Sequence, residues 1–343
     1  PYESQADSVM YRQVFAELAA QRQWAEHRFN ASTVEAEATK ILRERTEEVL
    51  YGPRKAIGAP WNKDHRAALA AIVVEYEILE PLLEPQLAVD GTADPIHPDG
   101  NIIRHQRVRA GDPDATGEVV VEGTYELGMQ DQAFLGLEAA LAVPDPGGKG
   151  VELHVATQWL HEDRAQIAAC LALPVESVRL VLGGVGGAFG AREDISLQVH
   201  TCLLALRLGR PVRIAYSRAE SFLGHVHRHP ATIWMRHHST AHGEIVKIES
   251  RMVFDGGAYA STSSAVLINA VTHTQGPYRC PNAVVDGYAV RTNHLPCGAM
   301  RGFGVVQACF AHESQMDKLA AACGLDPVEI RLRNAMRTGD PLI

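Results

Sequence analysis

A glycine-rich segment, Gly183-Gly-Val-Gly-Gly-Ala-Phe-Gly-Ala-Arg-Glu-Asp194, is the part of the chain best suited to bind a ligand. Glycine removes side chains where the backbone turns sharply, and it lets a large ligand approach the main chain. A strand-like apolar segment (178–182) precedes it, and a segment of helical period (195–206) follows. Because the first N–H groups of a helix are unbonded, this arrangement favours an oxyanion. We predict a ligand-binding loop between a strand and a helix; the alternative is a tight turn without a ligand.

The spacing of these glycines differs from both common phosphate-binding motifs. A dinucleotide fold requires Gly-x-Gly-x-x-Gly, but counting from Gly184 and Gly186 the third position is Phe189. A P-loop ends in Gly-Lys-Ser/Thr, and no such tripeptide follows the segment. The loop therefore indicates a ligand other than a nucleotide held by either motif.

A second glycine-rich segment, Cys297-Gly-Ala-Met-Arg-Gly-Phe-Gly304, carries side chains that suit a planar, charged ligand. Arg301 offers forked contacts to a phosphate or a heterocycle, and Phe303 can stack on an aromatic ring. The alternative is an arginine bonded to backbone carbonyls and a phenylalanine in the core. Glu193, at the end of the first segment, is a candidate hydrogen-bonding group for a substrate. Its alternative role is to stabilise a helix N-terminus by its charge.

Histidines cluster at His225-Val-His-Arg-His229, where alternating spacing would place three imidazoles on one face of a strand. The chain has no His-Glu-x-x-His motif and no cysteine pair near this cluster. Pro230 ends the run, as in a turn. We therefore favour solvated or hydrogen-bonded histidines over a metal site.

Composition narrows the class of protein. The chain has 343 residues, 46% of them hydrophobic, and a formal net charge of −9, which argues against non-specific nucleic-acid binding. No apolar run reaches membrane-spanning length. The six cysteines are scattered and form no Cys-x-x-Cys pair, which favours reduced thiols in the cytoplasm. It also argues against an iron–sulfur cluster or structural zinc site, and the absence of Gly-x-Ser-x-Gly argues against a serine hydrolase.

The elements that position these segments alternate between strands and helices from about residue 128 onward, which predicts a mixed α+β fold. Residues 1 to about 60 have a helical pattern, and the Pro-, Gly- and Asp-rich stretch 85–117 is expected to be a loop. His242-Gly243 predicts a hairpin turn, and Asp326-Pro327 predicts a helix start after a cap at Gly324. The expected strands are 73–79, 119–125, 151–157, 178–182 and 246–254, and the expected helices include 163–173 and 195–206.

Taken together, these segments resemble the molybdenum-binding large subunit of the xanthine dehydrogenase/aldehyde oxidase family. The closest type is the bacterial, purine-catabolic one with a separate molybdenum subunit. The resemblance extends from about residue 65 to the end. The segments that carry it are Gly186–Glu193, Arg228–Pro230, Gly276–Asn282, Ala299–Gly304 and Asp326–Ala335.

The resemblance implies a domain order. It gives a helical arm at 1–64 that does not match the family, the end of an a/b hammerhead-like domain with its linker at 65–126, and a first molybdopterin-binding domain at 127–343. By this resemblance, a second molybdopterin-binding domain is expected to be absent from these residues. The fold expected for the matched part contains mixed sheets and packed helices.

The resemblance also implies an activity. The cofactor would be a molybdenum–molybdopterin, in the cytosine dinucleotide form, that hydroxylates purines such as hypoxanthine or xanthine, or related N-heterocycles, with water as the oxygen source. Electrons would pass to 2Fe–2S and FAD groups on partner subunits of a cytoplasmic hetero-oligomer. The alternatives are an aldehyde-oxidising relative and a non-catalytic, truncated assembly module. A carbon monoxide-oxidising relative needs a cysteine in its active-site loop, and none lies between Val178 and Asp194.

The resemblance assigns roles residue by residue. Gln158 and Phe189 would lie near the metal through its other ligands, and Glu193 would orient a purine. Asn269 stands where animal enzymes have a substrate-facing arginine, which removes a cation able to stabilise negative charge. The general-base glutamate is expected beyond Ile343, so this chain alone is expected to be inactive. The cofactor-binding set is Gln158, Gly187, Phe189, Gly190 and Arg301, and the substrate-binding set is Glu193, Asn269 and Phe303.

Overall fold

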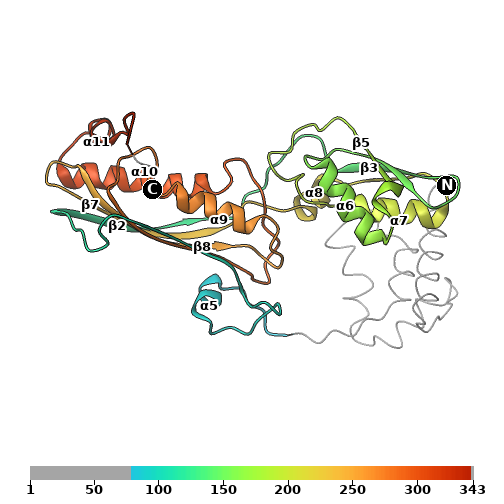
Figure 1. Cartoon of the computed structure of the whole chain (residues 1–343), viewed down its shortest axis with the longest axis horizontal. Helices are drawn as coiled ribbons and strands as arrows, with labels where there is room; N and C mark the ends of the chain where they lie inside the picture. Colours follow the sequence, from blue (N-terminus) through green and yellow to red (C-terminus); the bar gives the residue numbers. More distant parts are fainter. Residues whose placement is uncertain (1–78, 341–343) are drawn as a thin grey trace. The chain divides into compact units, whose positions relative to one another are not determined.

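The structure is a computed structural model that describes residues 79–340 (Figure 1). The chain divides into two compact units, Pro1–Glu80 and Pro81–Ile343, and the fold below belongs to the second. The predicted helical arm lies outside the described residues. Of the strand predicted over 73–79, only Leu79 is described, and it is not in a strand. The domain boundaries given above remain predictions.

A five-stranded mixed sheet forms the larger part of the second unit. Its strands lie in the order β1 (Ile102–Ala110), β9 (Asn282–Val290), β8 (Ile245–Asp255), β7 (Ala231–Ser239) and β2 (Val119–Leu127). Strands β8 and β9 run parallel, and the other neighbours are antiparallel. Apolar residues alternate along the central strands, so one face of the sheet is buried. Fully buried side chains from β7 and β8 include Ile233, Met235, Ile248, Met252 and Phe254.

Helices cover this face of the sheet (Figure 1). They are α9 (Ser263–Thr272) and the long α10 (Val305–Cys323), followed by α11 (Pro327–Asn334). Helix α10 ends at Gly324 in the left-handed conformation, and Asp326 caps α11 by accepting from Val328 N and Glu329 N. Both caps were predicted from the sequence and are confirmed.

A second, four-stranded mixed sheet has the order β5 (Val178–Leu182), β4 (Val151–Val155), β3 (Ala139–Pro144), β6 (Val212–Ala215). Strands β4 and β5 are parallel, whereas β3 is antiparallel to both of its neighbours. Helices α6 (Leu160–Leu171) and α7 (Gln198–Leu208) bury Ile167 and Cys202 in the core of this sheet. Two mixed sheets with packed helices confirm the predicted α+β class. The shorter elements are α5 (Pro85–Asp90), η3 (Val175–Ser177) and α8 (Arg218–Gly224).

The expectation of a loop over 85–117 is wrong in part: 91–101 and 111–117 contain no helix or strand, but 85–90 and 102–110 do. Helix α5 and strand β1 both lie within it, and β1 pairs with β9 along most of its length. Strand β1 carries Arg104, Arg107 and Arg109 at the edge of the sheet, and its residues are only half-buried or exposed. Long-range pairing therefore forms this strand, and its charged sequence carries little apolar signal. The other strands predicted within the described part are confirmed, as is the turn at Gly243, which has φ +81°.

Within residues 79–340, no helix is both long and apolar enough to cross a membrane.

The packing of α9 on the sheet predicts a sharp contrast between two neighbouring residues. Leu267 is 0% exposed in the core, whereas Ile268 is 37% exposed. We expect Leu267→Ala to lower the free energy of unfolding by about 2–5 kcal/mol, because it leaves a cavity. The matched substitution Ile268→Ala is expected to cost clearly less. Urea unfolding of the full chain followed by circular dichroism measures both, and equal losses would contradict the packing described.

Candidate functional site

The first glycine-rich loop follows strand β5 and has a backbone that most residues avoid. Gly186, Gly187 and Gly190 have φ values of +64°, +95° and +108°, and Phe189 has φ +54°. A Cβ atom at Gly187 would lie 3.2 Å from Phe134 Cβ and 3.4 Å from the Phe189 ring. The Phe189 side chain is nevertheless 48% exposed. The glycines therefore permit a tight turn that presents an aromatic ring to a ligand or to solvent.

A buried arginine holds this loop from beneath. Arg192 is 5% exposed and donates hydrogen bonds to the carbonyl oxygens of Val185 and Gly136. Its guanidinium lies 4.6 Å from the centroid of the Phe134 ring. Burial lowers its pKa, and the nearby Glu138 carboxylate raises it. The carbonyls that a sharp turn leaves unpaired are thus bonded by one side chain.

Gln158, just beyond strand β4, binds the other side of the loop. Its Oε1 accepts from Gly190 N at 3.0 Å and from Arg192 N at 3.4 Å, and its own backbone N donates to Arg192 O at 2.9 Å. These bonds fix the amide so that Oε1 faces the loop. Among the described residues, its Nε2 has no hydrogen-bond partner, and the residue is exposed. Gln158 thus offers two N–H donors to a molecule bound above the loop.

The second glycine-rich loop packs directly on the first. Arg301 N donates to Phe189 O at 2.8 Å, and a Cβ atom at Gly190 would lie 2.5 Å from Ala299 O. Only glycine permits this approach of two backbones. Gln132 Nε2 donates to Ala299 O at 2.7 Å, and Arg228 donates to Arg301 O at 2.8 Å. The Arg301 side chain is exposed and has no partner within residues 79–340.

The end of this second loop is strained. Gly302, Phe303 and Gly304 have φ values of +89°, +44° and +95°, a run that costs free energy at the non-glycine position. Asn269 on α9 donates from Nδ2 to Phe303 O at 2.8 Å, which holds the turn. The Phe303 ring is half-buried and packs against the core of the five-stranded sheet.

Two adjacent carboxyl groups follow the first loop. Burial raises the pKa of Glu193, and the charge of Asp194 raises it further. Burial also raises the pKa of Asp194, while a 2.7 Å hydrogen bond from Ser261 lowers it. Helix α7 starts only at Gln198, so the prediction of a helix N-terminus facing the loop is wrong. Helix α7 therefore does not stabilise Glu193, whose side chain is half-buried at the end of the first loop.

The predicted site residues are connected through these contacts. The first loop contains Gly187, Phe189 and Gly190, and Gln158 accepts a hydrogen bond from Gly190 N. The backbone N–H of Arg301 bonds the same loop at Phe189 O. Glu193 is joined to Gly190 by a 3.1 Å backbone hydrogen bond, and Asn269 is joined to Phe303. Sequence patterns did not reveal Gln132, Arg192 and Arg228, whose side chains donate hydrogen bonds to backbone carbonyls at the two loops. Arg192 lies within the recognised motif, but no spacing rule tells a buried arginine from an exposed one.

Comparison with known proteins identifies the family. Residues 96–335 match the molybdopterin cofactor-binding domain. The chain belongs to the xanthine dehydrogenase/aldehyde oxidoreductase family. The part of the family that it matches is the molybdenum-binding domain. The predicted resemblance is therefore confirmed.

Relatives of several names share this domain. The nicotinate dehydrogenase large molybdopterin subunit of Eubacterium barkeri is 38% identical over 85% of this chain and 69% of its own length. A probable xanthine dehydrogenase subunit from Bacillus subtilis is 36% identical over 83% of this chain, which spans 38% of that protein. The aldehyde oxidoreductase structure from Desulfovibrio gigas superposes with a TM-score of 0.75 at 28% identity, over 81% of this chain and 31% of that one.

The contact between the two loops predicts that Gly190 tolerates no side chain. Gly190→Ala combines φ +108° with a Cβ atom 2.5 Å from Ala299 O, and we expect it to cost about 1–3 kcal/mol of stability. Gly184 lies in the same loop with no atom within 4 Å of a Cβ position, so Gly184→Ala is the matched control. Thermal unfolding of both variants measures the difference. A Gly190→Ala variant as stable as Gly184→Ala would contradict the close approach of the loops.

Proposed function

We propose that the paired loops hold the molybdenum–molybdopterin cofactor of a hydroxylase that acts on N-heterocycles. The family is that of molybdenum hydroxylases. The observation that carries the proposal is the contact between Gly190 and Ala299 with Gln158 bonded to the same loop. This contact supports a shared site for the unbonded donors of Gln158 and Arg301, which come from distant parts of the sequence.

The residues at this place fit such a cofactor. Gly187 and Gly190 keep the backbone free of side chains, so a large group can reach the main chain. The Nε2 of Gln158 and the guanidinium of Arg301 supply donors, which match the oxygen and nitrogen acceptors of an oxo-metal pterin. Phe189 supplies an exposed ring on the same loop.

Each side chain has a distinct part in the proposed mechanism. When bound, the cofactor supplies the oxygen transfer and the two-electron chemistry. With the cofactor bound, Gln158 would donate a hydrogen bond to one of its acceptors, and the exposed Phe189 ring would exclude water from the same loop. Arg301 neutralises the anionic part of the cofactor. The general base is proposed to be a glutamate of the whole protein that is not among these residues.

The substrate proposed is an electron-poor N-heterocycle, with purines such as hypoxanthine or xanthine first. Burial and the neighbouring Asp194 raise the pKa of Glu193, which lowers the cost of protonating this carboxyl beside a purine edge that needs both a donor and an acceptor. Phe303 offers a ring edge beside the loop. Asn269 uses one N–H of its Nδ2 group on Phe303 O, so its second N–H and its Oδ1 acceptor remain for a substrate. Relatives named for xanthine and for nicotinate support the class.

The proposal extends to partners. The cytosine dinucleotide form of the cofactor, with 2Fe–2S and FAD groups on separate subunits of a hetero-oligomer, accords with relatives whose names call them subunits. The proposed location is the cytoplasm, which the six free cysteines support. The proposed role in purine catabolism is supported by relatives named for xanthine.

An aldehyde-oxidising activity is the second candidate. The observation that favours it is the likeness to an aldehyde oxidoreductase structure. Asn269 also removes a feature that a xanthine-specific site would use, because a neutral amide stabilises less negative charge than an arginine.

Arg301 provides the test of cofactor binding. Because its side chain is exposed and has no described partner, Arg301→Ala should leave the unfolding temperature unchanged. We expect it to weaken cofactor binding by about tenfold or more, since a charge-assisted bond is lost. Molybdenum by mass spectrometry and pterin by fluorescence, in protein purified under limiting cofactor, measure the loss. Arg104→Ala, an exposed arginine on β1, is the control, and equal cofactor content in both variants would refute the assignment.

Substrate assays on the complete, cofactor-loaded protein separate the two candidate activities. We expect higher kcat/KM for hypoxanthine and nicotinate than for benzaldehyde. Glu193→Ala should lower kcat/KM for hypoxanthine by about tenfold, because a hydrogen bond to the ring is lost, and should affect benzaldehyde little. Glu176→Ala on η3 is the control. Benzaldehyde as the better substrate, with Glu193→Ala without effect, would favour the second candidate.

A further inference from the structure

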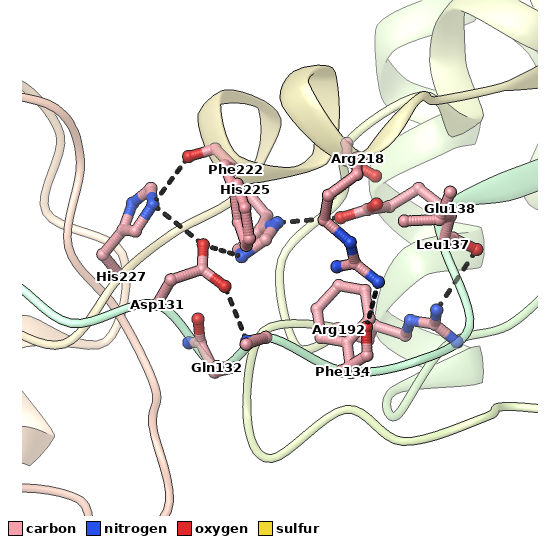
Figure 2. A network of polar contacts seen from close by, with 12 residues as sticks. Asp131, Gln132, Phe134, Leu137, Glu138, Arg192, Arg218, Phe222, His225 and His227 are labelled. Carbon is pink, nitrogen blue, oxygen red and sulfur yellow. Dashed lines mark hydrogen bonds and ion pairs between the residues drawn. The ribbon is translucent and has the colours of Figure 1, made fainter.

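Three side chains outside the loops converge in a buried position (Figure 2). Asp131 Oδ2 lies 3.1 Å from His225 Nε2 and 3.2 Å from His227 Nε2. The two imidazoles stack with centroids 5.3 Å apart. Their side chains are 2% and 6% exposed, and that of Asp131 is 20% exposed. Asp131 comes from the segment that joins β2 to β3, and the histidines come from the segment that joins α8 to β7.

Hydrogen bonds account for only part of this cluster. Asp131 Oδ2 and His225 Nε2 are both buried without a hydrogen-bond partner in the described part of the chain, despite their short separation. The carboxylate is anchored elsewhere, because its Oδ1 accepts from Ala133 N at 2.6 Å. Buried polar atoms without partners cost free energy, so a missing ligand is the simplest explanation of their arrangement.

The separations match those of a metal's ligands. In a tetrahedral zinc site, ligands at about 2.0–2.2 Å from the metal lie about 3.3 Å from one another. The two nitrogens lie at nearly this separation from the carboxylate oxygen. The carbonyl oxygen of Phe222 lies 2.9 Å from His227 Nε2 and would be the fourth ligand.

A second carboxylate orients one of the ligands. His225 Nδ1 lies 2.8 Å from Glu138 Oε1, and the Glu138 side chain is 6% exposed. A carboxylate that accepts from the far nitrogen fixes the imidazole tautomer and directs Nε2 toward a metal. Figure 2 shows Glu138, His225 and Asp131 in this order. His229, the third histidine of the run, instead bonds Ser263 Oγ at 2.8 Å, so the predicted single face of three imidazoles is wrong.

We propose that Asp131, His225, His227 and the Phe222 carbonyl bind a structural zinc ion. The ion would join the two chain segments that connect the sheets. The residues next to its ligands, Gln132 and Arg228, hold the second glycine-rich loop at Ala299 O and Arg301 O. Zinc would therefore stiffen the support of the candidate cofactor site without taking part in its chemistry.

Zinc binding by the full chain tests the proposal directly. Protein stripped with a chelator is titrated with zinc, and we expect uptake of about one ion per chain. Cobalt(II) in its place should give the intense visible absorption of a tetrahedral site. His227→Gln and Asp131→Asn should abolish uptake, and Glu138→Gln should weaken it by about 10–100-fold. His154→Gln, which alters an exposed 2.8 Å pair with Glu152, should retain it.

The readout is independent of the cofactor, because zinc and molybdenum are measured in the same samples. A folded wild-type chain that takes up no zinc would overturn the proposal, as would uptake unchanged in both ligand variants. Thermal unfolding shows whether the variants fold. If they do not, the cobalt spectrum of the wild-type chain decides, and an octahedral spectrum would exclude the four-coordinate site.

Discussion

The structure around the candidate site depends on the contact between two glycine-rich loops. Arg301 N bonds Phe189 O, and the Cα of Gly190 lies against the Ala299 carbonyl. The loops follow a strand of one sheet and a strand of the other, far apart in the sequence. A side chain at Gly190 would push the two loops apart. Their contact therefore requires a residue without a Cβ atom at this position.

This contact requires support, because neither loop has a regular backbone. Phe189 and Phe303 both have positive φ, which for a residue with a Cβ atom is costly. Buried arginines stabilise them: Arg192 bonds carbonyls beneath the first loop, and Arg228 bonds the second. Each arginine satisfies backbone oxygens that the sheets leave free. Unfavourable backbone conformations that neighbouring side chains hold in place are typical of a ligand-binding site.

Much of this arrangement was predictable from the sequence, and the reason is local chemistry. The glycine loops, the caps at Gly324 and Asp326 and the alternating strand β8 all follow from rules that act over a few residues. Strand β1 was missed because its pairing with β9 joins residues about 180 positions apart. The helix expected beside Glu193 starts later, since residues 194–197 form no helical turn and the first helical residue is Gln198.

The histidine cluster also depends on a contact between residues that are far apart in the sequence. Spacing suggested three imidazoles on one face, but the partner that gives two of them chemical meaning is Asp131, some 94 residues earlier. No local pattern reveals that neighbour. The role of Gln158 was predicted by resemblance, whereas its bond to Gly190 N is visible only in the fold.

Hydrogen–deuterium exchange of the chain with and without bound cofactor tests most directly whether the two loops form one site. If the two loops form one site, bound cofactor slows exchange in both segments together, at 186–193 and at 299–304, with little change in strand β1. Protection of only one loop, or equal protection throughout the sheets, would contradict a shared site.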